Sequence, residues 1–298
     1  MNLKQHRNRW PDFLAVGPPR TGTTWLHRAL VGHVGLPANV KEINFFDVYY
    51  DYGIDWYLSH FRRCSPDLPM GEVCTYFAFP HARERIQRHM PGCRIVVSLR
   101  DPVGRAYSHY KLMRCRAYTK ASFEEFLATR PMVNNANRYA FHLADWFACF
   151  GRQRVLVTFY DDLKKDPQAY FDRTCDFIGI ARSSLQDAQD LNDSVNSFSS
   201  RPRNHKLAQN ARHVLVYLKR NRAYRTINLF ARTGIWQFCF GGGDEYLPLT
   251  PEEDARVRER FRPEVEALED LLNLDLSAWK KPRDRRDPKP PNQSLAAD

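Results

Sequence analysis

One segment near the start of the chain constrains the fold more than any other. Residues 13–26 read FLAVGPPRTGTTWL, which is an apolar run, a Gly/Pro turn and a hydroxyl-rich helix start. Free N–H groups and the positive end of the helix dipole bind anions, so this pattern is typical of a phosphate-binding turn. The spacing of Gly17, Gly22 and Thr24 matches a P-loop, but Thr23 stands where a P-loop has lysine. Because a P-loop kinase or NTPase uses that lysine to bind the β- and γ-phosphates, its absence argues against nucleoside triphosphate chemistry. Two alternatives to another kind of phosphate-binding turn remain: a small-molecule kinase, and an ordinary strand–turn–helix with threonine caps.

Similar apolar runs recur at residues 94–99 and 154–159, each followed by a polar turn and an amphipathic segment. This alternation predicts βαβ units and an α/β, P-loop-like three-layer fold with a central parallel sheet flanked by helices. Helices are expected over residues 207–240 and from Thr250-Pro251 onward, with a loop at residues 241–243 between them. Without repeats or composition breaks, we expect one domain over residues 1–280 and a disordered basic tail over 281–298.

The composition favours an anionic ligand. The 298 residues include 45 Lys and Arg against 34 Asp and Glu, a formal charge of +11. A solubilising basic surface or a non-catalytic binder of nucleic acid would carry the same excess of positive charge. The seven cysteines lack metal-ligand spacing, so we expect reduced thiols and no metal. Met1–Trp10 lacks an apolar run, and we therefore expect a cytoplasmic protein with no membrane partner.

A second anion site is predicted where the run at 94–99 ends. Arg100 closes this run, Asp101-Pro102 is typical of a helix N-cap, and Ser108 lies about two turns into the helix. An arginine at a strand tip and a hydroxyl on the next helix can together bind a phosphate. Alone this signal is weak, because Arg-Asp pairs commonly serve structure.

The two segments together resemble the sulfotransferases that use 3′-phosphoadenosine-5′-phosphosulfate (PAPS), and the likeness is greatest to their bacterial and heparan-sulfate-type branch. The family's usual 5′ loop reads PKSGTTW, and residues 18–26 read PPRTGTTWL. The resemblance implies that Arg100 and Ser108 bind the 3′-phosphate, and that the 5′ side is bound by Arg20, Thr21, Gly22, Thr23, Thr24 and Trp25. Arg20 replaces the family's lysine, which keeps the charge but makes proton donation to the leaving group doubtful.

The resemblance also implies a general base. Residues 41–47 read KEINFFD and are similar to the KExxFF segment of the heparan-type enzymes, whose glutamate is the proposed base. Glu42 is therefore the candidate for taking the acceptor proton, and Arg20 for stabilising the leaving oxygen during in-line transfer. A surface salt bridge with Lys41 is the alternative role for Glu42.

Further segments suggest the acceptor side and a late loop. The resemblance assigns the acceptor to Lys41, Phe45, Phe46 and Glu72, although the aromatic run over residues 45–61 fits a helix core equally well. Residues 196–203 resemble the loop that closes over the nucleotide, so Arg201 and Arg203 are candidate PAPS ligands or plain surface charges. The expected reaction moves a sulfuryl group from PAPS to a hydroxyl or amine of a carbohydrate or small molecule, releasing PAP, with no nucleic-acid partner. Neither the acceptor nor the oligomeric state follows from the sequence.

Overall fold

The computed structural model describes residues 9–185 and 200–282. The predicted tail, apart from residues 281 and 282, and the late-loop residues 196–199 lie outside this part of the chain. Within the described residues, no helix has both the length and the apolar character needed to cross a bilayer.

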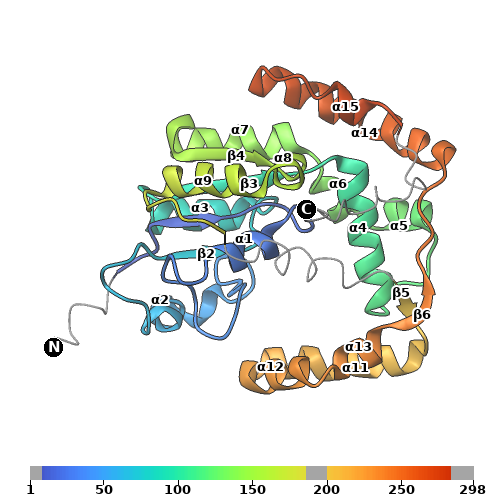
Figure 1. The fold of residues 1–298 in the computed structure, drawn as a ribbon, viewed down its shortest axis with the longest axis horizontal. Coiled ribbons are helices and arrows are strands. Elements are labelled where there is room, and N and C mark those ends of the chain that lie inside the picture. The colour runs from blue at the N-terminus through green and yellow to red at the C-terminus, as the bar shows by residue number, and fades with distance from the viewer. Residues whose placement is uncertain (1–8, 186–199, 283–298) are drawn as a thin grey trace, which may run out of the picture.

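A parallel sheet of four strands forms the centre of the α/β region (Figure 1). In spatial order the strands are β2 (Gly71–Val73), β1 (Phe13–Ala15), β3 (Arg94–Leu99) and β4 (Val155–Phe159). The predicted runs at 13–17, 94–99 and 154–159 therefore contain strands, as expected. β2 was not predicted, because three residues are too few to show an alternating pattern.

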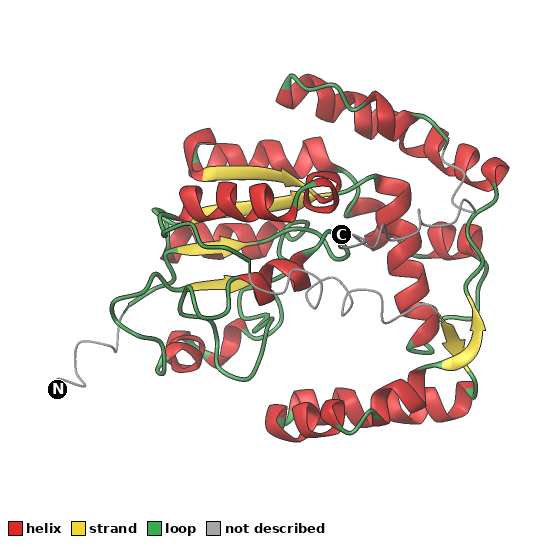
Figure 2. Cartoon of the chain, viewed as in Figure 1, coloured by secondary structure: helices red, strands yellow, loops and turns green. Residues whose placement is uncertain are grey.

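Helices cover both faces of this sheet (Figure 2). Alternate strand residues enter two core clusters: Leu14 and Val97 pack on one face, and Phe13 and Val96 pack on the other. The first face is covered by α3 (Pro80–His89) and α7 (Tyr139–Phe150), and the second by α1 (Thr23–Ala29) and α9 (Pro167–Ile178). Strands buried on both faces are expected in a parallel sheet, and the predicted three-layer α/β fold is confirmed.

Further helices lie in the connections between these layers. They are α2 (Ile54–Leu58), α4 (Pro102–Cys115), α5 (Phe123–Thr129), α6 (Pro131–Asn135) and α8 (Tyr160–Lys165). Asp101 accepts a hydrogen bond from the Val103 N–H and is the predicted N-cap of α4. Because β1 and β3 are adjacent and parallel, the turns that lead into α1 and α4 meet at one edge of the sheet.

Three further helices project from a second, antiparallel pair of strands (Figure 1). The strands are β5 (Ser200–Pro202) and β6 (Gly242–Glu245), and between them lie α11 (His205–Arg220), α12 (Tyr224–Arg232) and α13 (Ile235–Phe240). The helical prediction for 207–240 is confirmed, but the predicted loop at 241–243 is wrong. A Cβ on Gly243 would lie 2.7 Å from the Arg201 carbonyl oxygen, so glycine here permits close strand pairing.

The chain returns to the central region through a long helix. α14 (Pro251–Leu272) begins with the predicted capping box of Thr250 and Glu253. It packs against α4 and α7, and α15 (Ser277–Lys280) follows it.

Candidate active site

The turn between β1 and α1 is held in shape by its own polar groups. The Thr21 hydroxyl donates to the Pro18 carbonyl (2.8 Å), and the Ser98 hydroxyl of β3 donates to the Thr21 carbonyl (2.6 Å). Gly22 is the N-cap residue of α1 with a φ of 94°, and a Cβ there would lie 2.9 Å from Leu163. As a glycine, Gly22 has no side chain with which to cap the α1 N-terminus. The first N–H groups of α1 are thus available to an anion.

The structure brings the two predicted phosphate-binding segments into direct contact. The Arg20 Nε donates to the Ser108 hydroxyl (2.9 Å), and an Arg100 Nη donates to the Arg20 carbonyl (3.1 Å). The Arg100 guanidinium also lies over the Tyr160 ring, 4.4 Å from its centroid. Burial and the neighbouring Arg100 charge lower the pKa of Arg20 to about 10. Two cations held this close form a site suited to a polyanion.

Arg20 has a backbone conformation that is unusual for a residue with a side chain. Its φ of 78° lies in the left-handed region, where L-residues other than glycine are uncommon. Such strain persists where the surrounding structure imposes it, and the contacts to Ser108 and Arg100 do so here.

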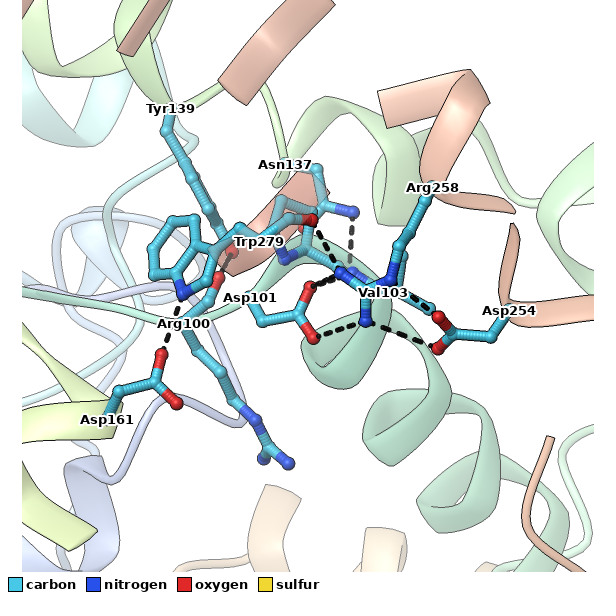
Figure 3. Close-up of polar contacts among 10 residues, drawn as sticks. Arg100, Asp101, Val103, Asn137, Tyr139, Asp161, Asp254, Arg258 and Trp279 are labelled. Atoms are coloured by element: carbon cyan, nitrogen blue, oxygen red, sulfur yellow. Dashed lines mark hydrogen bonds and ion pairs between the residues drawn. The ribbon is translucent and has the colours of Figure 1, made fainter. Parts of the chain in front are cut away.

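A buried ion network lies directly behind Arg100 (Figure 3). Arg258 of α14 binds both oxygens of Asp101 (3.2 and 3.1 Å) and both oxygens of Asp254 (2.5 and 3.3 Å). It also donates to the Trp279 carbonyl (2.5 Å). All three charged groups are almost fully buried. Sequence reasoning missed Arg258; the i,i+4 spacing of Asp254 and Arg258 was the available signal, but surface pairs have the same spacing.

Two aromatic residues complete the support of this strand end. The Tyr139 hydroxyl donates to the Arg100 carbonyl (2.9 Å), and the Trp279 indole donates to Asp161 (2.7 Å). Helix α7 therefore holds the backbone of Arg100, and Trp279 ties α15 to the neighbouring helix α8.

A cavity of about 410 Å³ opens beside the phosphate loop. Residues from the loop, from the segment around Glu42 and from the projecting helices line it together. Among its lining residues are Arg20, Thr23, Thr24, Lys41, Glu42, Arg116, Lys219, Tyr224 and Asn228. The predicted base and the predicted sulfonate-binding arginine thus face one space.

Lys41 links the predicted base to the phosphate loop. Its ammonium group lies 2.5 Å from a Glu42 carboxylate oxygen and donates to the Thr23 hydroxyl (3.3 Å). Thr23 occupies the position that is lysine in a P-loop. The ammonium group of Lys41 therefore supplies a positive charge close to that position. The salt bridge considered as an alternative for Glu42 is present, but it is part of the cavity lining.

Three predicted acceptor residues do not line this cavity. Phe45 and Phe46 are fully buried, and Phe45 stacks on Tyr57 with centroids 4.8 Å apart. Glu72 is also fully buried and accepts hydrogen bonds from the Ile43 N–H (2.9 Å) and the Tyr57 hydroxyl (3.1 Å). The aromatic segment packs as core, and contact of these three residues with an acceptor stays a prediction. Glu72 instead fixes the backbone next to Glu42, and burial raises its pKa to about 7.

Three predicted nucleotide ligands also lie apart from the cavity. The Trp25 indole is buried against Tyr170 in the core, so direct contact of this side chain with the nucleotide is excluded in this conformation. Arg201 and Arg203 lie on and just after β5, where Arg203 donates to the Gly242 carbonyl (3.1 Å). Their contact with PAPS stays a prediction.

Sequence reasoning missed the cavity residues contributed from outside the motifs. Arg116 follows α4, and Lys219, Tyr224 and Asn228 come from α11 and α12. The basic helical character of 207–240 was recognised, but nothing in that pattern indicated which surface these helices approach.

The parallel sheet, the phosphate loop and the adjoining arginine define an α/β protein with a nucleotide-type anion site. The family model described as "Sulfotransferase domain" matches residues 10–213. The chain therefore belongs to the sulfotransferase family, and the predicted family is confirmed.

Curated relatives are similar to this chain in sequence, and a solved structure is similar in fold. The chain is 30% identical over 210 residues to bifunctional heparan sulfate N-deacetylase/N-sulfotransferase 3 of Homo sapiens, covering 59% of this chain and 24% of that protein. It is 30% identical over 176 residues to the corresponding enzyme 1 of Caenorhabditis elegans, covering 53% and 20%. The chain thus spans about a quarter or less of these curated relatives. A sulfotransferase from Alicyclobacillus acidocaldarius shares the fold, with a TM-score of 0.66, 21% identity and coverage of 92% of this chain and all of that one.

Proposed function

We propose that the cavity beside the phosphate loop is where this sulfotransferase moves the sulfuryl group of PAPS to a hydroxyl or amine of a carbohydrate or small molecule. One observation carries the proposal: Arg20 and Glu42 line a single cavity, and Arg20 also contacts both Ser108 and Arg100. A donor phosphate, its sulfonate and an acceptor group can therefore be bound within reach of one another.

Each residue has a distinct role in the proposed transfer. The α1 N-terminus, with Thr23 and Thr24, binds the 5′-phosphate, and Arg100 with Ser108 binds the 3′-phosphate. Glu42 takes the acceptor proton as the acceptor atom attacks sulfur, and the bond from sulfur to the phosphate oxygen breaks. Arg20 and Lys41 then stabilise the charge that develops on the PAP oxygen.

The structure favours Glu42 over two other bases. Burial, Arg105 and Arg20 lower the pKa of His109 to about 3, which makes its imidazole a weak base at neutral pH. Asp47 is paired with His81 at 2.9 Å and is not among the residues that line the cavity.

The test combines transfer with ligand binding. Purified protein is incubated with radiolabelled PAPS and a panel of alcohols, amines and glycans, and PAP affinity is measured by calorimetry. We expect Glu42→Gln to lower kcat by roughly 10²- to 10⁴-fold while PAP affinity stays nearly unchanged. Asp47→Asn is the matched control and should keep full activity. Failure of the wild-type protein to bind PAP, or full activity of Glu42→Gln, would reject the proposal.

A further inference from the structure

The three helices between β5 and β6 differ in charge from the rest of the chain. Residues 205–240, here called the basic arm, contain seven Lys and Arg and no Asp or Glu. In Figure 1 the arm runs from the β5–β6 pair as a separate layer of helices below the region of α1 and α2. A surface with this charge attracts anions at long range.

The basic arm also leaves large apolar side chains in solvent. Phe238 is 72% exposed, Tyr217 66% and Leu229 60%, and these residues come from three different helices. Val214, Val216 and Ile235 are exposed as well. These six large apolar side chains exposed on one segment of the chain are more than its fold requires, and such exposure is typical of an interaction surface.

The packing at the root of the arm explains why these side chains remain outside. The buried cluster there consists mainly of small residues: Ala208 and Ala211 of α11 meet Cys115, Ala117, Cys239 and Phe240. Close packing through alanines and cysteines uses little of the apolar surface of the arm. The larger apolar groups are consequently left for another partner.

We propose that the basic arm docks on an anionic lipid surface. Cationic side chains next to exposed aliphatic and aromatic groups are the composition of helices that bind the membrane interface. A nucleic acid or acidic glycan would satisfy the charges but offer no apolar phase for Leu229, Ile235 and Phe238. A second copy of the arm would bring like charges together. The sequence by itself had indicated no membrane partner, and the exposed apolar groups of the arm argue against that expectation.

Docking through the arm has a consequence for the cavity. Lys219, Tyr224 and Asn228 belong to the arm and also line the cavity. An arm bound to a lipid surface therefore holds the cavity within about one helix diameter of that surface.

Vesicle sedimentation with the full chain, without PAPS, tests this directly. Vesicles of equal parts phosphatidylcholine and phosphatidylglycerol should bind the protein, and pure phosphatidylcholine should not. Binding should weaken when NaCl is raised from roughly 0.1 to 1 M, because the Debye length falls from about 10 to about 3 Å.

Two variants separate the charge from the apolar contribution. Arg220→Gln/Arg225→Gln/Arg232→Gln and Leu229→Ser/Ile235→Ser/Phe238→Ser should each lower the partition coefficient about tenfold or more. The matched control, Met132→Ser/Phe141→Ser, alters exposed apolar residues of α6 and α7 and should bind like the wild type. Circular dichroism and PAP affinity establish that each variant is folded.

Three outcomes would overturn the proposal. They are no vesicle binding by the wild type, vesicle binding unaffected by the apolar substitutions, or a dimer that the apolar substitutions dissociate in the absence of lipid. Vesicle binding is measured without PAPS or acceptor, so a failure to bind vesicles does not contradict the proposed transfer reaction. Likewise, a failure to bind PAP or to transfer the sulfuryl group does not contradict docking of the arm on lipid.

Discussion

The helix α14 and the basic arm both carry arginines, but the two segments differ in what surrounds these charges. On α14, Arg258 is buried between Asp101 and Asp254, and Arg256 and Arg262 pair with glutamates at the surface. The arm has no acidic residue of its own, and its cations lie beside exposed apolar groups. A charge whose partners are supplied by the fold holds the site in place, whereas a charge without acids on its own segment is suited to an external partner.

The largest expected effect on stability comes from replacing Arg258, the buried arginine in this comparison. Arg258→Met should lower the free energy of unfolding by about 3–5 kcal/mol, because it leaves Asp101 and Asp254 buried without their cation. Urea denaturation measures the change. Arg256→Met on the same helix is the matched control and should cost at most about 1 kcal/mol, since the Arg256–Glu124 pair is exposed. Equal effects of the two substitutions would contradict this structural role of Arg258.

A second experiment extends the comparison to a buried acid that accepts hydrogen bonds from hydroxyls and a backbone N–H. Burial raises the pKa of Glu72 from 4.5 to about 7, so the folded state binds this proton more tightly than the unfolded chain. The protein should therefore lose about 3 kcal/mol of stability through this group as pH rises from about 4.5 to about 7.

The variant Glu72→Gln isolates this contribution. Its urea midpoint should decline less steeply over that pH range than the wild-type midpoint, because the amide does not ionise. The control Glu84→Gln changes an exposed acid on α3 and should follow the wild type. Parallel profiles for Glu72→Gln and the wild type would show that Glu72 does not titrate in this way.

A third experiment examines what the buried network supports. Arg100→Ala should weaken PAP binding by about 1.5–3 kcal/mol, about 10- to 150-fold, through loss of a charge-assisted contact. Arg100→Lys should restore part of this affinity, because it keeps the charge without the planar fork. Calorimetry with PAP gives both values, and an unchanged dissociation constant for Arg100→Ala would remove Arg100 from the nucleotide site.

The smallest expected effect is on the arm. The Arg222 guanidinium lies over the rings of Tyr52 and Trp56, 4.7 and 4.6 Å from their centroids. Arg222→Ala should lower the free energy of unfolding by only about 0.5–1 kcal/mol, the usual range for an exposed cation–π contact. Urea denaturation beside the control Arg220→Ala checks this, and a loss as large as that of Arg258→Met would mean that the arm is part of the core.

Local patterns allowed much of the fold to be predicted. The strand at 94–99, the cap at Asp101 and the capping box at Thr250 each depend on a few neighbouring residues, and all three are present. The single-domain assignment over residues 1–280 stays a prediction. The sequence was least informative where one pattern serves two structures. Phe45 and Phe46 fit a cleft or a core equally well, and glycines 241–243 fit a loop or a closely paired strand.

Sequence alone determined the family, the phosphate loop and the candidate base, because these reside in short contiguous segments whose chemistry is local. Only the tertiary structure decided that Arg20 contacts Ser108, 88 residues away, and that Arg258 lies behind Asp101, 157 residues away. It also brought the basic arm to the cavity that Glu42 lines. The physical reason is that burial and pairing depend on which segments the core packs together, and a charged residue has the same local pattern on a surface as in a buried network.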